Sequence, residues 1–562
     1  MTTDKTEITH LAEILYRKGL RTAIISPGSR NAPLVMAFNR HKGIECLSII
    51  DERSAAFFAL GMAQQSCIPV VIISTSGTAA LNYAPAIAEA FYQEIPLIIL
   101  TADRPVEFID QAEGQAIRQK GIFANYIKKS FELPQQIYSS DDLWYNDRIV
   151  SESFNLATTG RPGPVHINVP FREPLYGVAE AHNKNIKIIE QVSTSRQPSQ
   201  PILEKLISTW NSYQKKMIVS GMLKPDIELN HELNMISSDN SLVVLTETTS
   251  NLNGKNFFPC IDKILSSFDD NEAGEFAPRL LVTIGSHVIS KMLKSFLRNH
   301  TPIEHWHIEA SGLAPDTYQS LTKIIQQNPA DFFKIINESK INTDSNFREL
   351  WQKRDIDNEN LHAKYLSNLP FSDLKVYEQI LKAVPEFSNL QMANSAGVRY
   401  VQLFRPFKQL SYNANRGTSG IDGCTSTGAG AAHFSKIPTT LVTGDIAFLY
   451  DSNALWNKHL PDNLKIIIVN NSGGGIFRFI SGPSGVEELE EYFETKHDIT
   501  VKYIAKNFNV DYLFCDKPNE LNDCLKWLYK NTKKTAILEI KTPAKESAEI
   551  LKSYFKFMKR KI

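Results

Sequence analysis

The sequence predicts an α/β protein built from three doubly wound domains with parallel sheets. Over the first 180 residues, short apolar runs end in small or polar residues and alternate with helical stretches, as strands and helices do in such domains. The alternation is weaker in the middle of the chain and returns from Phe371 to the end. At 562 residues the chain is longer than a single core supports, so several domains are expected.

Shifts in composition along the chain predict the domain limits. We expect domains at 1–185, 200–345 and 370–562, with the first and third alike in architecture. The polar stretch 192–201 is expected to be a linker, and the charged stretch 342–369 an exposed helix leading into the third domain. The middle domain has no GxGxxG motif, so a dinucleotide site there lacks support.

The overall composition is that of an ordinary globular enzyme. Lys plus Arg and Asp plus Glu both number 61, which argues against a nucleic-acid partner. The six cysteines are scattered without metal-ligand spacing, as is typical of buried thiols in a reducing compartment. No run approaches the roughly 18 apolar residues of a membrane span, and the acidic N-terminal segment is unlike a signal peptide. We therefore expect a cytoplasmic protein without a membrane span.

The stretch Thr439–Phe477 is the most informative part of the chain. One apolar run ends in Gly444 and Asp445, a second ends just before Asn471, and a helical segment lies between them. Strands joined in this way are parallel neighbours, and open α/β sheets bind ligands at their carboxyl ends. One carboxylate, one amide oxygen and the backbone around Gly473 suit an Mg²⁺ ion that keeps a phosphate among its ligands. The alternative is that these residues simply close turns.

The GD and NN pair at this spacing resembles the thiamine-diphosphate signature, although Ile446 stands where that signature has a further glycine. The chain also carries, in the order seen in one family of such enzymes, the motifs SPGSRNAPL, DERSAAFFALGMA, TSGTAALNYAPAIAEA, LTADRP, GQAIRQ, NRGTSGIDG and GGGIF. It resembles the menaquinone-pathway synthases that join 2-oxoglutarate to isochorismate with loss of CO₂, giving 2-succinyl-5-enolpyruvyl-6-hydroxy-3-cyclohexene-1-carboxylate. The resemblance implies thiamine diphosphate with Mg²⁺ or Mn²⁺, and a homodimer or homotetramer whose active sites lie between subunits.

The same resemblance assigns roles in catalysis and cofactor binding. The implied catalytic residues are Glu52, Gln115 and Ser395. Glu52 would share a proton with N1′ of the cofactor's aminopyrimidine, and its apolar surroundings would raise its pKa as that sharing requires. Its alternative role is that of an ordinary acid at a helix N-terminus. The implied cofactor-binding residues are Glu52, Thr75, Gly77, Ile421, Gly444, Asp445, Asn471 and Gly473, of which Asp445, Asn471 and Gly473 would hold the metal. Thr75 has the alternative role of a helix cap, and Ile421 that of core packing.

The substrates implied by the resemblance are dicarboxylates, which arginine binds through a planar pair of donors. The implied substrate-binding residues are Ser29, Arg30, Arg104, Gln115, Lys291, Ser395, Arg399, Arg416, Ile476 and Phe477. For each arginine the alternative is a structural or surface ion pair. The chain departs from the family pattern at Met292, which follows Lys291 in place of an arginine, and at Gly114. Arg118 stays unassigned.

Two other functions fit parts of the sequence. A different 2-oxo-acid carboligase, such as an acetolactate synthase, would favour neutral acceptors, so the arginines at strand ends count against it. A cofactor-binding regulator with a dead site is also conceivable, but the intact Glu52, Asp445 and Asn471 argue against it.

Overall fold

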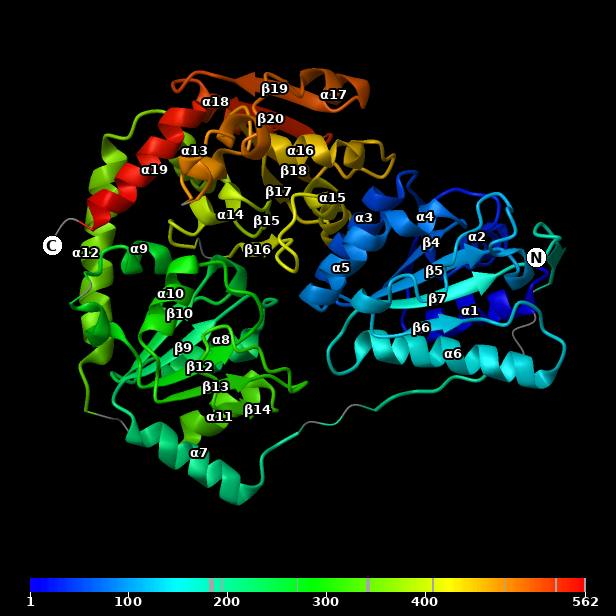
Figure 1. The fold of residues 1–562 in the computed structure, drawn as a ribbon, viewed down its shortest axis with the longest axis horizontal. Coiled ribbons are helices and arrows are strands. Elements are labelled where there is room, and N and C mark those ends of the chain that lie inside the picture. Colours follow the sequence, from blue (N-terminus) through cyan, green and yellow to red (C-terminus); the bar gives the residue numbers. More distant parts are fainter. Residues whose placement is uncertain are drawn as a thin grey trace.

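The described part of the chain forms three six-stranded parallel sheets flanked by helices, and a two-stranded antiparallel pair of β1 (Thr2–Thr3) with β8 (Val178–Ala179) (Figure 1). The computed structural model describes residues 1–180, 186–192, 194, 196–269, 271–339, 344–406, 409–480, 482–530 and 533–559. The predicted fold class is confirmed. In Figure 1 the first sheet (blue and cyan) lies on the right, the third (yellow to red) above it and the middle one (green) at the lower left.

The first sheet has the strand order β3-β2-β4-β5-β7-β6. Its central strands are buried and mostly apolar, such as VVIIS in β4, because helices cover both faces of a parallel sheet. The strands are β2 (Thr22–Ile25), β3 (Glu45–Ser48), β4 (Val70–Ser74), β5 (Leu97–Asp103), β6 (Ser130–Glu132) and β7 (Val165–Pro170). The helices are α1 (Thr6–Arg17), α2 (Ala32–Asn39), α3 (Glu52–Ser66), α4 (Thr78–Asn82), α5 (Ala84–Gln93) and α6 (Ser140–Thr158).

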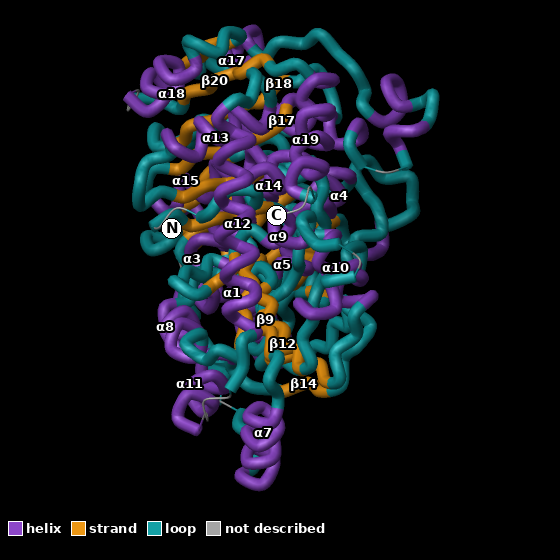
Figure 2. Tube along the Cα trace, turned by 90° about the vertical axis from the view of Figure 1, so that its left-hand side faces the viewer, coloured by secondary structure: helices purple, strands orange, loops and turns teal. Residues whose placement is uncertain are grey.

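The third sheet repeats this order as β16-β15-β17-β18-β20-β19, so the first and third sheets are alike, as predicted. Figure 2 shows its strands β17, β18 and β20 in the upper half, above strands β9, β12 and β14 of the middle sheet. The strands are β15 (Asn389–Met392), β16 (Ser411–Ala414), β17 (Thr439–Gly444), β18 (Leu464–Asn470), β19 (Asp511–Cys515) and β20 (Ala536–Lys541). The helices are α13 (Asp373–Ala383), α14 (Ala396–Val401), α15 (Cys424–Ser435), α16 (Asp445–Tyr450), α17 (Lys502–Asn507), α18 (Leu521–Lys530) and α19 (Ala544–Met558).

The middle sheet has a different order, β11-β10-β9-β12-β13-β14. Counted from its own first strand this is 3-2-1-4-5-6, the order of dinucleotide-binding folds. The strands are β9 (Lys216–Ser220), β10 (Leu242–Thr246), β11 (Phe257–Phe258), β12 (Leu280–Ile284), β13 (Glu304–Ile308) and β14 (Lys323–Ile325). The helices are α7 (Gln200–Ser212), α8 (Ile227–Ile236), α9 (Ile261–Leu265), α10 (Lys291–Asn299), α11 (Pro329–Ser339) and α12 (Phe347–Ser367).

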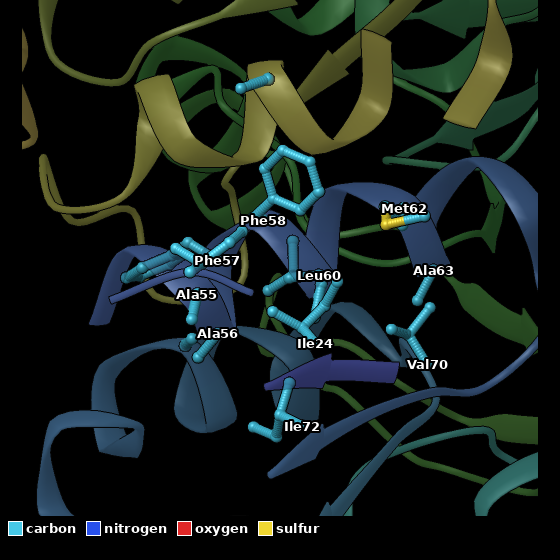
Figure 3. Packing of buried hydrophobic residues seen from close by; sticks show 14 of the residues in the cluster. Ile24, Ala55, Ala56, Phe57, Phe58, Leu60, Met62, Ala63, Val70 and Ile72 are labelled. Carbon is cyan, nitrogen blue, oxygen red and sulfur yellow. The ribbon is translucent and has the colours of Figure 1, made fainter. Parts of the chain in front are cut away.

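One hydrophobic core joins the first and third sheets. It contains Phe57 and Phe58 of α3 together with Ala429 of α15 and Ile466 of β18, and Figure 3 shows the side chains that α3 contributes. The helices α3 and α15 cross at two glycines: a Cβ on Gly61 would lie 2.1 Å from the Thr427 carbonyl oxygen, and one on Gly430 would lie 2.0 Å from that of Phe58. The crossing therefore allows no side chain at either position, and the two helices meet backbone to backbone.

The helix expected over the charged stretch 342–369 exists as α12, but the expectation that it is exposed is wrong. One stripe of α12 is buried; its members are Phe347, Trp351, Asp355, Asn358, His362 and Leu366. Trp351 donates to the Phe276 carbonyl oxygen in the middle domain (3.2 Å), and His362 lies 2.8 Å from the Tyr554 hydroxyl of α19. The helix α12 thus packs against both the middle and the third domain. Because several of its buried residues are polar, the sequence did not indicate that this face is buried.

The predicted domain limits are consistent with three separate sheets, but the boundary residues themselves stay predictions. Two of the predicted domain limits, 185 and 562, lie outside the described residues. Two positions of the predicted linker, 193 and 195, do so as well. The described part of 192–201 is irregular up to the start of α7 at Gln200. Within the described residues, no helix is long and apolar enough to cross a membrane.

Candidate active site

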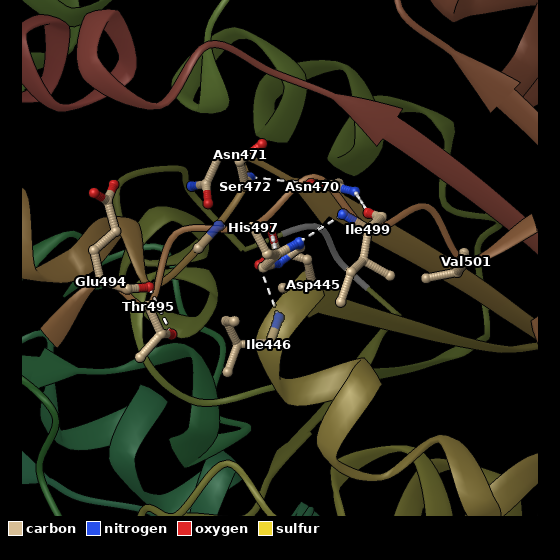
Figure 4. Close-up of polar contacts among 12 residues, drawn as sticks. Asp445, Ile446, Asn470, Asn471, Ser472, Glu494, Thr495, His497, Ile499 and Val501 are labelled. Atoms are coloured by element: carbon tan, nitrogen blue, oxygen red, sulfur yellow. Dashed lines mark hydrogen bonds and ion pairs between the residues drawn. The ribbon is translucent and has the colours of Figure 1, made fainter. Parts of the chain in front are cut away.

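The carboxyl ends of β17 and β18 form the centre of the candidate site. The two strands pair in parallel, with Gly444 opposite Val469, so the predicted neighbours are confirmed. Asp445 begins α16 and Asn471 directly follows β18. The Asp445 carboxylate accepts hydrogen bonds from the backbone N–H groups of Ile446 (2.8 Å) and Gly473 (2.9 Å), which joins the two loops (Figure 4).

Asp445 is buried and faces a histidine. Burial raises the pKa of Asp445 to about 6. His497 Nε2 lies 3.3 Å from Asp445 Oδ2, and His497 Nδ1 accepts a hydrogen bond from the Ile499 N–H (3.0 Å). The contact with Asp445 is a close approach without hydrogen-bond geometry, because His497 Nε2 is buried with no hydrogen-bond partner among the described residues. Figure 4 shows His497 beside Asp445 at the mouth of the two loops.

Asn471 is oriented by a second buried carboxylate. Its amide nitrogen donates to Asp373 Oδ2 at 2.9 Å, while Asp373 Oδ1 accepts from the hydroxyls of Thr542 (2.6 Å) and Ser547 (3.3 Å). Burial raises the pKa of Asp373. With its nitrogen engaged, Asn471 presents its carbonyl oxygen Oδ1, which accepts no hydrogen bond from a described residue.

A segment around Glu494 lies against the glycine loop. Gly474 N–H donates to the Glu494 carbonyl oxygen (2.6 Å), and His497 N–H donates to that of Ser472 (3.1 Å). Gly473 has a φ of 151°, and a Cβ there would lie 2.7 Å from the same Glu494 oxygen. This close approach requires glycine. Ile476 and Phe477 follow as a half-buried turn, with the Phe477 ring 5.9 Å from that of Phe493.

The donor set at these loops fits a hard cation. No group of three or more His, Cys, Asp or Glu side chains suited to a metal occurs among the described residues. One carboxylate, the free amide oxygen of Asn471 and nearby backbone carbonyls leave further positions for phosphate oxygens and water, as Mg²⁺ prefers.

The first domain contributes a second set of strand-end groups. Glu52 begins α3 and forms no ion pair with a described residue, while its burial raises its pKa. The hydroxyls of Thr75 and Ser76 are buried without a hydrogen-bond partner among the described residues. Such orphaned groups are uncommon in native proteins and are consistent with a bound ligand.

Gly77 and Gln115 lie against each other. A Cβ on Gly77, whose φ is 87°, would lie 3.3 Å from Gln115 Cα, and the Gly77 N–H donates to the Gln119 side chain (2.8 Å). Gln115 itself has a φ of 55°. Among the implied catalytic residues, Ser395 likewise has a positive φ, of 72°. Backbone strain of this kind is concentrated at functional sites.

The arginines of the first domain already have partners. Arg30 Nη1 pairs with Glu173 (3.1 Å), and Arg104 donates to the Gly114 carbonyl oxygen (2.9 Å). Burial, with the nearby Arg104 charge, lowers the pKa of Arg30. Ser29 is exposed beside them. The unassigned Arg118 is 82% exposed and pairs with Asp110 (2.7 Å), as a surface residue does.

The third domain holds Arg399 and Arg416. Arg399 Nη1 donates to the Ser395 carbonyl oxygen (2.7 Å), and Arg416 Nη1 donates to the Asn394 side chain (3.1 Å). Ile421 packs against Ala393, Cys424 and Ala447, next to the start of α16. Lys291 and Met292 are both exposed at the start of α10.

The segment that carries Glu52 contacts the end of α16 opposite to Asp445. Next to Glu52, Arg53 donates to the carbonyl oxygen of Tyr450, the last residue of α16 (2.8 Å), whereas Asp445 is its first residue. At about 1.5 Å per residue, the helix separates these ends by roughly 9 Å. Among the described residues, no hydrogen bond or ion pair joins Glu52 to Asp445.

Sequence reasoning missed several residues that support these groups. They are Glu89, Gln119, Asp373 and His497. Glu89 is buried on α5 and accepts from the N–H groups of Gly417 and Thr418, each at 2.7 Å, directly after Arg416. Gln119 and Glu89 each carried a signal, since they lie in the motifs GQAIRQ and TSGTAALNYAPAIAEA. Asp373 resembled an ordinary acid in the first turn of a helix.

Comparison with protein families defines the class. Three family models match in succession: "Thiamine pyrophosphate enzyme, N-terminal TPP binding domain" at 6–122, "Middle domain of thiamine pyrophosphate" at 183–391 and "Thiamine pyrophosphate enzyme, C-terminal TPP binding domain" at 392–540. Fold and site are thus those of a thiamine pyrophosphate enzyme, and thiamine diphosphate is its cofactor.

Similar curated proteins narrow the class. A protein of Flavobacterium psychrophilum is 44% identical over 97% of this chain and 98% of its own length. A protein of Christiangramia forsetii is 42% identical over 96% of this chain and 97% of its own length. A protein of Porphyromonas gingivalis is 39% identical over 99% of this chain and 97% of its own length. All three are named 2-succinyl-5-enolpyruvyl-6-hydroxy-3-cyclohexene-1-carboxylate synthase. This chain belongs to that family, and the resemblance inferred from its motifs is confirmed.

Proposed function

We propose that the protein catalyses the thiamine-diphosphate-dependent decarboxylation of 2-oxoglutarate and the addition of the resulting succinyl-semialdehyde unit to isochorismate. The product is 2-succinyl-5-enolpyruvyl-6-hydroxy-3-cyclohexene-1-carboxylate, and CO₂ is released. The observation that carries this proposal is the full-length identity of 44% with a synthase of that name, in a chain that retains Glu52, Asp445 and Asn471.

The residues of the GD and NN loops hold the metal and the diphosphate. Asp445, Asn471 Oδ1 and the Gly473 carbonyl oxygen bind Mg²⁺ or Mn²⁺, and Gly444 lets the diphosphate approach the backbone because nothing lies within 4 Å of its Cβ position. When bound, thiamine diphosphate supplies the electron sink for the carbanion left by CO₂.

Glu52 and several other residues bind the aminopyrimidine of the cofactor. Glu52 holds a proton at N1′, which its raised pKa favours. Thr75 and Gly77 line the ring, and Ile421 supports the bent cofactor from the third domain. Gln115 and Ser395 are polar groups beside the reacting carbon.

The substrate carboxylates are bound by Arg30, Arg104, Arg399 and Arg416. Ser29, Gln115, Ser395 and Lys291 add polar contacts, and Ile476 with Phe477 forms an apolar wall for the ring of isochorismate. An acceptor with two carboxylates explains why arginines gather at strand ends, which the neutral acceptors of an acetolactate synthase do not.

We propose a homodimer or homotetramer in which Glu52 acts on the cofactor held by another subunit. This is supported by the lack of a hydrogen bond or ion pair between Glu52 and Asp445 among the described residues, because a second copy can supply the missing half of each site. The limits 1–185, 200–345 and 370–562 and a cytoplasmic location are part of the same proposal.

The test mixes purified protein, thiamine diphosphate, Mg²⁺ and 2-oxoglutarate with and without isochorismate. We expect the absorbance of isochorismate to fall only in the complete mixture, and chelation of the metal with EDTA to stop the reaction. Turnover of pyruvate without turnover of 2-oxoglutarate would instead indicate a different carboligase.

A further inference from the structure

A buried carboxylate of the first domain, that of Glu89 on α5, holds a loop of the third domain. Glu89 is 1% exposed. Its Oε1 accepts from the Gly417 N–H (2.7 Å) and from the Gln93 side-chain amide (2.5 Å). Its Oε2 accepts from both the N–H (2.7 Å) and the hydroxyl (2.5 Å) of Thr418. An ionised carboxylate accepts in this way at both oxygens, and such charge-assisted bonds are among the strong ones.

The loop fits against α5 only because residue 417 is a glycine. A Cβ on Gly417 would lie 2.6 Å from the Glu89 carbonyl oxygen and 3.1 Å from both Glu89 Oε1 and Tyr92 Cβ. The carbonyl oxygen belongs to the helix backbone and cannot rotate away, so a side chain here would push the loop off the helix. The contact between the two domains is therefore made at close range by the backbone of the loop.

A second residue, Asn394, holds the same loop from the third domain. The Asn394 amide nitrogen donates to the carbonyl oxygens of Asn415 and Gly420, the latter at 2.6 Å. Its side-chain oxygen accepts from Arg416 Nη1 (3.1 Å). Asn394 is buried, as Glu89 is. The loop is thus fixed by one buried side chain from each of the two domains.

The loop carries two residues of the proposed site, Arg416 at its start and Ile421 at its end. Ile421 packs against Ala447 in α16, the helix that Asp445 begins. Burial lowers the pKa of Arg416, and the negative charge of Glu89 acts in the opposite direction. A displacement of the loop would therefore reach both the cofactor and the substrate side of the site.

We propose that Glu89 is a positioning residue for the reaction, acting through the loop that it holds so that Ile421 supports the bent thiamine diphosphate. The inference rests on the proposed function, which gives that role to Ile421. Because Asn394 holds the loop independently, loss of the Glu89 carboxylate should shift the loop and leave the GD and NN loops in place. A misplacement of about 1 Å can cost about 10²-fold in rate, even when it arises far from the reacting atoms.

The first measurement is hydrogen exchange of the loop amides in the full-length protein with thiamine diphosphate and Mg²⁺. Glu89→Gln replaces one accepting oxygen by an NH₂ group, which faces donors that it cannot accept from. We expect the amides of Gly417 and Thr418 to exchange at least about tenfold faster than in the wild type. The matched control is Glu94→Gln, the same change at the end of α5, where the carboxylate pairs with Arg161 inside the first domain (2.7 Å). It should leave the exchange of the loop unchanged.

The second measurement is exchange of the C2 proton of bound thiamine diphosphate for deuterium, which needs no substrate. With cofactor and Mg²⁺ saturating, this exchange should be about 10²-fold slower in Glu89→Gln and unchanged in Glu94→Gln. Thr418→Val removes only the hydroxyl donor and should slow the exchange less. Combined with Glu89→Gln, it should cause no further loss, because both changes act on one contact.

A purely structural contact would loosen the loop without slowing the cofactor. The proposal is therefore overturned if the C2 proton exchanges at the wild-type rate in Glu89→Gln, or if the loop amides are unaffected. If Glu89→Gln does not fold, Thr418→Val decides the question by the same two measurements. Slow C2 exchange in Glu89→Gln, with no consumption of isochorismate by the wild type, would reject the proposed function and leave the positioning role.

Discussion

The amide nitrogen of Asn471 donates to the carboxylate of Asp373 at 2.9 Å, and this bond decides which atom of the amide faces the proposed metal site. An ionised carboxylate only accepts hydrogen bonds, so the Asn471 carbonyl oxygen is directed to the opposite side. Outer residues of this kind orient metal ligands and commonly affect affinity as much as the ligands themselves do.

Replacing Asp373 should weaken metal binding. We expect Asp373→Ala to lower the apparent Mg²⁺ affinity roughly 10- to 100-fold, because the Asn471 amide loses its fixed orientation. The measurement is a Mg²⁺ titration at constant thiamine diphosphate, followed by tryptophan fluorescence. Asp523→Ala, whose side chain is 81% exposed, serves as the control. An unchanged Mg²⁺ midpoint in folded Asp373→Ala would contradict the role.

Glu52 should be required for chemistry but not for cofactor binding. Glu52→Gln removes the proton-sharing acid and should slow CO₂ release from 2-oxoglutarate roughly 10²- to 10⁴-fold. Thermal stabilisation by thiamine diphosphate and Mg²⁺ should persist. Glu228→Gln makes the same change in the exposed first turn of α8, where only the helix dipole is affected. If both variants kept full activity, Glu52 would be an ordinary helix-terminal acid.

The crossing of α3 and α15 should tolerate no added atom. A methyl group at Gly61 would improve helix propensity by about 1 kcal/mol, but it meets a backbone oxygen at 2.1 Å that cannot rotate away. Overpacking of this kind costs about 1–3 kcal/mol or more. We expect Gly61→Ala to lower the free energy of unfolding in urea. Gly485→Ala, with nothing within 4 Å of its Cβ position, should not lower it.

Asp451 should make stability depend on pH. It is fully buried, accepts from the Ser426 N–H (2.7 Å) and hydroxyl (2.9 Å), and burial raises its pKa to about 7. Between the unfolded pKa near 3.8 and this value, the folded state holds a proton that the unfolded state releases. The contribution is therefore complete below pH 3.8 and is lost as the pH rises towards 7.

The matching variant is Asp451→Asn, which cannot titrate. Across pH 4.5–6.5, the free energy of unfolding of the wild type should decline more steeply than that of the variant, by up to about 1.4 kcal/mol per pH unit. Urea unfolding at several pH values measures both slopes. Parallel slopes would show that Asp451 is not protonated in the folded protein.

Much of the site could be predicted because it follows from strand order. Gly444, Asp445 and Asn471 end two apolar runs, and parallel pairing alone brings such ends together. The remaining residues depend on contacts between distant segments. Asp373 reaches Asn471 from another helix, and Glu89 reaches the Gly417 N–H from another domain. The buried stripe of α12 is partly polar, through Asp355, Asn358 and His362, so hydrophobic periodicity did not reveal it.

The paired glycines Gly61 and Gly430 also determine how the enzyme can open. Helices that touch through their backbones have no layer of side chains between them, so we expect the first and third domains to move together. A hinge between them is therefore not available for admitting a dicarboxylate. Entry and exit must instead use the loops that cover the strand ends, of which the Glu494–His497 segment over the glycine loop is the nearest to the metal ligands. The rate of product release should then depend on the rate at which these loops open.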